Sequence, residues 1–237
     1  MLTLASASPR RQELLRLTGW EIVSRSADVD ERREPGEGPE QLTRRLATAK
    51  ARVGRSELVL GADTVVVPDN KMLGKSAAGG ELVLGADTVV VLDNEILGKP
   101  AGQPEARGML RALRGRTHRV ISSIALVDGA GREVALDTCV SEVPMREYSD
   151  AEIERYLASG SPFDKAGAYG IQDGGFNPVS MDQMHDCFAN VMGLPLCHLV
   201  RSLRKLGYEP PADVPAACQA HTGYVCPVYP VILRGEQ

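Results

Sequence analysis

The sequence predicts an α/β domain. Short apolar runs typical of strands alternate along the chain with segments in which apolar residues recur at helical spacing. The chain of 237 residues, of which 43% are hydrophobic and 24% are charged, is long enough to bury a full core. We therefore expect one domain, or one domain with an appendage.

The first predicted elements are a strand, a helix and a second strand. Residues 2–5 are mostly apolar and are expected to form the first strand. Ser8 is suited to cap the helix that follows, Pro9 is tolerated in its first turn, and Gly19 ends it. Residues 21–24 form the second strand.

A loop and a second helix come next. Residues 28–39 are charged and rich in Pro and Gly, which predicts a loop. In the following helix Leu42 and Leu46 belong to one apolar stripe. Lys50 lies four residues after Leu46, so it projects from the edge of that stripe.

One segment of the chain occurs twice. Residues 57–67 recur as residues 81–91, and matching residues continue after each copy. Solenoid folds need about three or more repeats, so two copies favour a local tandem duplication over residues 57–104 of one domain. We expect one copy to form a strand of the sheet and the other to form an insertion.

The elements after the repeat are two helices and a pair of strands. Residues 104–113 predict a helix, and residues 118–127 and 132–143 predict strands joined by a turn. Ser149 and Glu152 match the capping box of another helix.

The end of the domain is predicted near residue 207. Residues 163–175 are rich in glycine, and residues 194–206 predict the last helix. Residues 208–237 are rich in Pro and Ala and are expected to form an irregular tail after a domain that spans residues 1–207.

The first stretch with chemical potential lies at the turn between the first strand and the first helix. It holds Ser6, Ser8, Arg10 and Arg11. The first turn of a helix offers free N–H groups and a partial positive charge to a phosphate, and Arg adds paired donors. A capped helix with solvated arginines is the alternative interpretation.

Each copy of the repeat supplies an Asp at the expected end of an apolar strand, then a Thr and a Lys. The residues are Asp63, Thr64 and Lys75 in the first copy and Asp87, Thr88 and Lys99 in the second. A carboxylate at a strand end could hold Mg²⁺ or activate a water, and the lysine would neutralise phosphate. A turn Asp with a surface Lys is the alternative.

The third stretch is residues 164–172. Its small residues let a ligand approach the backbone, Lys165 offers charge, and Gln172 offers a donor and an acceptor suited to the edge of a base. A structural turn is the alternative.

Taken together, these stretches resemble the Maf family between residue 1 and about residue 207. Residues 6–11, the Gly-Ala-Asp-Thr-Val-Val stretch, residues 164–172 and residues 190–196 occur in the order found in the family. The resemblance implies a fold like that of the inosine triphosphate pyrophosphatases, with an elongated mixed sheet flanked by helices and a central cleft. It also implies a homodimer.

The family resemblance implies hydrolysis of a nucleoside triphosphate between its α and β phosphates with a divalent cation, Mg²⁺ or else Mn²⁺ or Co²⁺. The pairing of Leu-Gly-Lys-Pro with Ala-Tyr-Gly-Ile-Gln resembles the branch that acts on dTTP and UTP in the house-cleaning of nucleotide pools. The alternatives are a 7-methyl-GTP pyrophosphatase and a non-catalytic nucleotide-binding septum regulator.

The resemblance also implies roles for individual residues. Asp87, or Asp63 in the other copy, matches the general base, and Asp87 with Glu31 would hold the metal. The implied substrate-binding residues are Ser6, Ser8, Arg10, Arg11, Glu31, Lys50, Thr88 or Thr64, Lys99 or Lys75, Lys165 and Gln172. The second copy is favoured because Lys99 and the residues after it continue the family pattern, although the first copy keeps the closer spacing to Lys50.

Composition limits the partners and the compartment. A net charge of −4, three Phe and one Trp argue against nucleic-acid binding. The sequence has no apolar run that approaches about 20 residues, so no membrane span is expected, and no secretory signal. Five cysteines, an odd number, fit a reducing cytoplasm. Cys218 and His221, with Cys226 and Cys187, are a candidate zinc site, with incidental residues as the alternative.

Overall fold

A mixed β-sheet forms the centre of the computed structural model, which describes residues 2–56 and 82–236. Its six strands are β1 (Leu2–Ala5), β2 (Ile22–Arg25), β3 (Leu82–Leu92), β4 (Glu95–Leu97), β5 (Thr117–Val127) and β6 (Glu133–Pro144). The strand order is β2-β1-β3-β5-β6, with β4 paired to β3. β1 runs parallel to β2 and β3, whereas β3, β5 and β6 are antiparallel. The predicted α/β class is confirmed.

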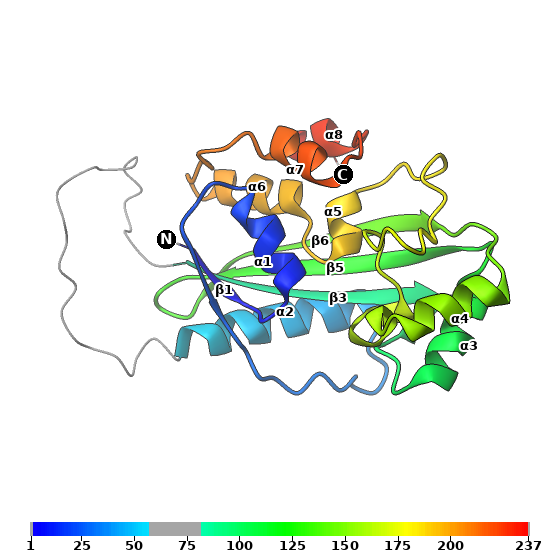
Figure 1. Cartoon of the computed structure of the whole chain (residues 1–237). Helices are drawn as coiled ribbons and strands as arrows, with labels where there is room; N and C mark the ends of the chain where they lie inside the picture. Colours follow the sequence, from blue (N-terminus) through cyan, green and yellow to red (C-terminus); the bar gives the residue numbers. More distant parts are fainter. Residues whose placement is uncertain (1, 57–81, 237) are drawn as a thin grey trace.

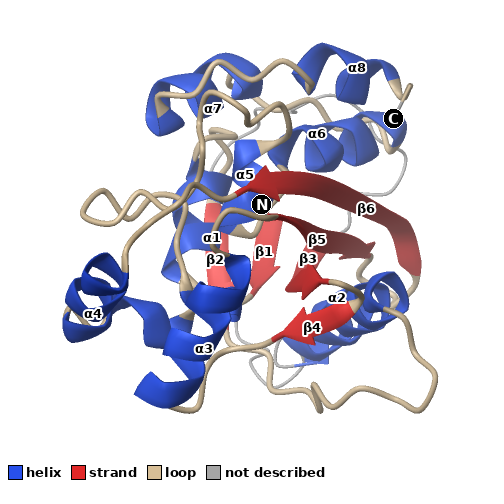
Figure 2. Cartoon of the chain, turned by 90° about the vertical axis from the view of Figure 1, so that its right-hand side faces the viewer, coloured by secondary structure: helices blue, strands red, loops and turns tan. Residues whose placement is uncertain are grey.

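Helices cover both faces of this sheet. They are α1 (Pro9–Arg16), α2 (Pro39–Ser56), α3 (Gln103–Leu113), α4 (Asp150–Ala158), α5 (Phe188–Met192), α6 (Leu196–Lys205), α7 (Val214–Thr222) and α8 (Tyr229–Arg234). In Figure 1, α2 lies below the sheet, and α1, α5 and α6 lie above it. Figure 2 shows α7 and α8 stacked over α6. No helix in the described part of the chain is long and apolar enough to span a membrane.

Several helix boundaries follow from the capping residues found in the sequence. The side chain of Ser8 accepts a hydrogen bond from the backbone N–H of Arg11, and Pro9 occupies the first turn of α1. Ser149 and Glu152 form both hydrogen bonds of a capping box at the start of α4. These caps satisfy free N–H groups of the first turn and so fix the residue at which each helix begins.

α2 packs unusually close to the sheet because small residues meet at the contact. Ala47 and Ala51 of α2 are completely buried. Gly85 of β3 lies against them, and a Cβ atom at this position would fall 2.0 Å from the carbonyl oxygen of Ala47. Glycine is therefore required at residue 85, and it sets the distance between α2 and β3.

The second copy of the repeat forms β3. Pairing with β1 ends at Leu84, and pairing with β4 begins at Val90. Between these points β3 is hydrogen-bonded on its β5 side only, so Asp87 and Thr88 lie at a gap in the sheet. The expectation that Asp87 ends a strand is wrong, because β1 ends early and creates this gap in the middle of β3.

The chain after β6 differs from the prediction in two places. The predicted helix at residues 194–206 is confirmed as α6, but a separate short helix, α5, precedes it. The tail that was expected to be irregular contains α7 and α8. Proline lies in the first turn of both helices, where it is tolerated, so a composition rich in Pro did not exclude helix. The division of the chain at residue 207 stays a prediction.

Candidate active site

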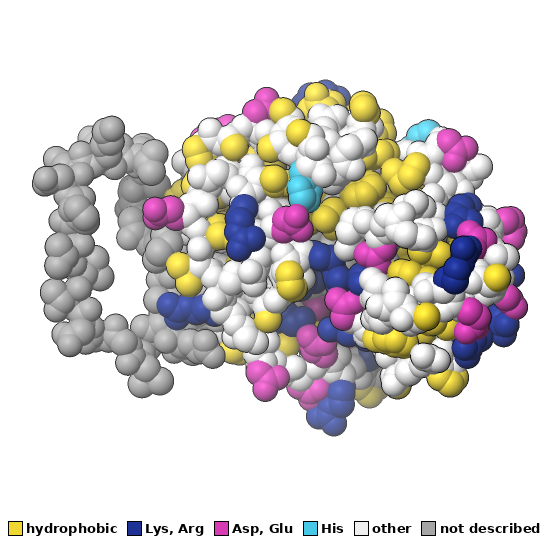
Figure 3. Space-filling model, viewed as in Figure 1, with side chains coloured by type: hydrophobic (Ala, Val, Ile, Leu, Met, Phe, Trp, Pro, Cys, Tyr) yellow, Lys and Arg dark blue, Asp and Glu magenta, His cyan; other side chains and the backbone are white. Residues whose placement is uncertain are grey.

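One cavity of about 520 Å³ gathers the residues that the sequence analysis singled out in the described part of the chain. It opens at the gap in the sheet, between the start of α1, the face of α2 and the turns that follow α4. Basic and acidic side chains gather around a hollow near the middle of the face in Figure 3. The predicted site residues that line the cavity are Ser6, Ser8, Arg10, Arg11, Glu31, Lys50, Asp87, Thr88, Lys99, Lys165 and Gln172.

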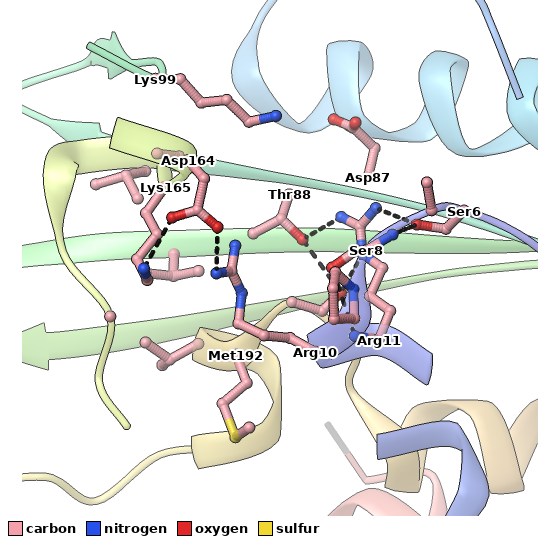
Figure 4. A pocket seen from close by; sticks show the side chains of 18 of the residues that line it. Ser6, Ser8, Arg10, Arg11, Asp87, Thr88, Lys99, Asp164, Lys165 and Met192 are labelled. Atoms are coloured by element: carbon pink, nitrogen blue, oxygen red, sulfur yellow. Dashed lines mark hydrogen bonds and ion pairs between the residues drawn. The ribbon is translucent and has the colours of Figure 1, made fainter. Parts of the chain in front are cut away.

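Arg11 is fixed at the centre of this cleft by neutral oxygen atoms. Its Nε donates to the carbonyl oxygen of Gly193 at 2.9 Å, and its Nη2 donates to Oγ1 of Thr88 at 3.0 Å. Its Nη1 reaches Oγ of Ser6 at 3.5 Å. Figure 4 shows the contacts of Arg11 with Thr88 and Ser6. Removal from water lowers the pKa of the Arg11 guanidinium, and no described carboxylate forms an ion pair with it.

Lys50, Asp87 and Glu31 form a group that we call the Asp87 cluster. Nζ of Lys50 lies 2.7 Å from Oδ1 of Asp87 and 2.6 Å from Oε1 of Glu31. The side chains of Lys50 and Asp87 are 10% and 9% exposed, whereas that of Glu31 is 61% exposed. Burial acts to raise the pKa of Glu31, but the hydrogen bond and charge of Lys50 outweigh it, so this pKa is lowered.

The close packing of α2 explains how Lys50 reaches Asp87. Residues two apart on a strand point to the same face, so Gly85 and Asp87 both face α2. Because Gly85 admits the backbone of α2 at Ala47 and Ala51, the lysine between those turns is held within hydrogen-bond distance of the carboxylate. The glycine of the Gly-Ala-Asp-Thr stretch therefore serves helix packing.

A second group, which we call the Asp164 cluster, was only partly found from the sequence. It consists of Arg10, Asp164 and Lys165. Asp164 accepts from Nη1 of Arg10 at 3.0 Å and from Nζ of Lys165 at 2.8 Å. Asp164 was not predicted as a site residue, and only its place beside Lys165 in the glycine-rich stretch pointed to it.

The surroundings of Lys165 hold it in the wall of the cleft. Besides Asp164, its Nζ donates to the carbonyl oxygen of Ser161 at 2.5 Å and to Oγ of Ser161 at 2.9 Å. Asp173 lies 3.5 Å away and also accepts from Tyr156. A Cβ atom on Gly170 would meet both Lys165 and Asp173 at 2.8 Å, so a small residue is needed for this contact.

Lys99 and Gln172 line the cleft as exposed side chains. Neither makes a hydrogen bond or an ion pair with another residue in the described ranges. In Figure 4 the ammonium group of Lys99 extends toward Asp87. Its positive charge contributes to the lowered pKa of Glu31. Both side chains are therefore available to a ligand.

The oxygen donors in the cleft suit a magnesium ion that completes its coordination with water and phosphate. They are too few for a site in which the protein supplies every ligand. Asp87 and Glu31 both contact the same ammonium group, so their carboxylates lie close enough to share one cation. Mg²⁺ usually takes one or two carboxylates and fills its other positions with water and phosphate oxygens. Over residues 2–56 and 82–236 no group of three or more His, Cys, Asp or Glu side chains could hold a metal.

The candidate zinc site is not supported. Cys187, Cys218 and Cys226 do line one small cavity with Cys197. However, they form no metal-binding group within the described residues, and the nearest ion pair of His221 is with Glu13 at 3.7 Å.

The first copy of the repeat lies outside the described residues. Asp63, Thr64 and Lys75 therefore have no described position, whereas the matching residues of the second copy line the cleft. The preference for the second copy as the active one stays a prediction.

The sequence matches the family described as Maf-like protein over residues 1–80 and 75–206. The chain belongs to the Maf-like protein family. The two matched ranges each contain one copy of the repeat.

Several curated relatives of this Maf-like protein are named dTTP/UTP pyrophosphatase. One from Chromobacterium violaceum is 40% identical over 88% of this chain and 96% of its own length. One from Anaeromyxobacter dehalogenans is 40% identical over 90% of this chain and 98% of its own length. One from Desulfitobacterium hafniense is 41% identical over 87% of this chain and 86% of its own.

Among solved structures, a nucleoside-triphosphatase described as a dITP/XTP pyrophosphatase from Mycobacterium abscessus shows a distant similarity. It is 16% identical, with a TM-score of 0.36 over 61% of this chain and 72% of its own.

Proposed function

We propose that this Maf-like protein hydrolyses dTTP or UTP to the nucleoside monophosphate and pyrophosphate. One observation carries the proposal: a single cleft is lined by Arg10, Arg11, Lys50, Lys99 and Lys165 and by the buried carboxylate of Asp87. A triphosphate requires dense positive charge, and its hydrolysis requires a group that handles the proton of a water. The names of the relatives support the choice of pyrimidine substrate.

The phosphate chain is proposed to lie across the first turn of α1, in contact with the basic side chains. Arg11 is already oriented by Thr88 and Gly193, and no carboxylate in residues 2–56 and 82–236 forms an ion pair with it. A donor held in place before the reaction loses little entropy on binding and can stabilise the charge that develops on the phosphate oxygens.

Asp87 is proposed as the general base. It would orient a water for attack on the α-phosphorus and accept its proton as the bond to pyrophosphate breaks. Nζ of Lys50 donates to the buried carboxylate of Asp87 at 2.7 Å and so gives it a charged partner in a position with little water. Lys99 is free to neutralise the leaving pyrophosphate.

A divalent cation is proposed to complete the site, with Mg²⁺ favoured and Mn²⁺ or Co²⁺ as alternatives. Asp87 and Glu31 would hold it, and the cation would neutralise phosphate charge. Cation binding to these carboxylates would release Lys50 toward the phosphates.

The resemblance to the family also supports a homodimer, and the odd number of cysteines supports a cytoplasmic location. Sedimentation equilibrium of the full chain would test the first of these proposals. A role in removing unwanted nucleotides from the pool follows from the proposed reaction.

A substrate panel tests the proposed function. Purified protein would be given dTTP, UTP, CTP, GTP and 7-methyl-GTP with Mg²⁺, Mn²⁺, Co²⁺ or a chelator, and pyrophosphate and phosphate would be measured separately. We expect pyrophosphate from dTTP and UTP, and none in chelator. Preference for 7-methyl-GTP, or binding of nucleotides without turnover, would favour one of the alternatives instead.

A further inference from the structure

The carboxylate of Asp164 contacts two cations that are proposed to bind the phosphate chain. One of its oxygens accepts from Arg10 and the other from Lys165. The Asp164 side chain is 65% exposed, whereas that of Lys165 is only 9% exposed. In Figure 4, Asp164 lies between the two basic groups. An anion that binds Arg10 or Lys165 must share these donors with Asp164 or displace it.

Most of the positive charge in the cleft is already used. Within the described ranges, Arg10 pairs with Asp164, Lys165 pairs with Asp164 and more distantly with Asp173, and Lys50 pairs with the two carboxylates of the Asp87 cluster. The cleft cations without an ion pair to a described carboxylate are Arg11 and Lys99. The number of negative charges on a ligand therefore decides how many of these internal pairs it can replace.

We propose that Asp164 is an internal competitor of the phosphate chain, which occupies Arg10 and Lys165 between turnovers and is displaced when a triphosphate binds. This inference rests on the proposed function, because it assumes that the ligand of the cleft is a polyphosphate. By returning to Arg10 and Lys165, Asp164 weakens the hold of the cleft on product pyrophosphate. Asp164 thus sets affinity and does not take part in the chemical step.

The exposure of Asp164 makes this exchange inexpensive. An exposed carboxylate regains water when its ion pairs break, so such pairs contribute little to stability. Partial burial acts to raise the pKa of Asp164, but the hydrogen bond and charge of Lys165, together with Arg10, lower it, so the competitor is ionised at neutral pH. The buried pair of Lys50 and Asp87 has no comparable access to water.

The proposal is tested by whether Asp164→Asn binds pyrophosphate more tightly or more weakly than the unmodified chain. Asp164→Asn keeps the size of the side chain and removes its charge. We expect it to bind inorganic pyrophosphate up to about fivefold more tightly than the unmodified chain in titration calorimetry, because an exposed ion pair is worth up to about fivefold in affinity. The KM for dTTP should fall, and kcat should not rise. Unchanged or weaker pyrophosphate binding would overturn the proposal, because a residue that merely organises Arg10 and Lys165 would weaken binding when lost.

Asp150 offers a matched control. It is 55% exposed and bridges two cations, Arg111 and Arg114, away from the cleft. Asp150→Asn should leave pyrophosphate binding unchanged, and equal tightening in both variants would count against the proposal. Calorimetry needs no turnover, so tighter binding by Asp164→Asn would support the inference even if dTTP and UTP were not hydrolysed. If Asp164→Asn turned over dTTP normally and bound pyrophosphate as the unmodified chain does, the inference about Asp164 would be wrong and the proposed function would stand.

Discussion

The Asp87 cluster and the Asp164 cluster line the same cleft and combine the same kinds of side chain, but they differ in burial. In the Asp87 cluster, Asp87 and Lys50 are 9% and 10% exposed, and only the second carboxylate, Glu31, is exposed, at 61%. In the Asp164 cluster the carboxylate is 65% exposed. Breaking a buried pair leaves a charge without water, whereas breaking an exposed pair costs little. We infer that the first cluster is built to stay together until a cation and a substrate replace its contacts, and the second to exchange partners.

The largest effect is expected where helix packing holds the Asp87 cluster together. Gly85→Ala would place a methyl group 2.0 Å from the carbonyl oxygen of Ala47 and push α2, with Lys50, away from Asp87. We expect a loss of roughly 3 kcal/mol or more in the free energy of unfolding, measured by denaturant titration.

The first copy of the repeated segment provides the control for Gly85→Ala. Gly61→Ala changes the matching residue of the first copy and should have no measurable effect on stability. If Gly85→Ala were as stable as the unmodified chain, the first copy would be able to take the place of β3, and the difference between the two clusters would not depend on residue 85.

The next largest effect is expected when the Asp87 cluster loses its cation. Lys50→Met leaves Asp87 buried without compensation, which should cost roughly 3 kcal/mol of stability. It should also lower kcat/KM for dTTP at least about 100-fold, because both carboxylate and phosphate lose a positive partner. Arg44→Met, an exposed change on the same helix, is the control. Near-normal kcat/KM for Lys50→Met would show that the buried pair is not part of the site.

An effect that is confined to acid pH is expected in the turn that carries the Asp164 cluster. His118 is buried and its Nε2 lies 2.7 Å from the hydroxyl of Tyr169, which lies four residues after Lys165. Burial lowers the pKa of His118 from 6.5 to about 4. Between these values the unfolded chain binds more protons than the folded chain, so stability should fall as the pH drops from 6.5 toward 4.

The lowered pKa of His118 sets the size of this loss of stability. The free energy of unfolding should fall by roughly 3 kcal/mol between pH 6.5 and pH 4. Thermal unfolding of the unmodified chain and of His118→Gln at a series of pH values would measure it. The variant should show a flatter dependence on pH, and an identical slope in both proteins would assign the proton uptake to another group.

The sequence predicted the parts of the fold that depend on local contacts. Ser8 and Ser149 cap helices because a cap needs only the next three residues, and the long strands β5 and β6 follow from their apolar patterns. The position of the site was predicted less well. Asp87 lies at a gap that depends on where β1 ends, and β1 is remote in sequence.

The role of Asp164 could not be predicted for a similar reason. Arg10 is 154 residues away in the chain, and nothing local marks the two as partners. Likewise, the packing role of Gly85 becomes visible only when α2 lies against β3. α7 and α8 were missed because Val214 and Ile232 become buried only through packing of the tail on the domain, with Arg201 of α6 donating to the carbonyl oxygen of Ile232.

The central claim is that the carboxylate of the second copy, Asp87, acts on the substrate. The most direct test is the rate of pyrophosphate release from dTTP and UTP by Asp87→Asn and by Asp63→Asn, each compared with the unmodified chain. We predict that Asp87→Asn loses about three orders of magnitude in kcat with its fold intact and that Asp63→Asn keeps full activity. Full activity in Asp87→Asn, or an equal loss in Asp63→Asn, would contradict this claim.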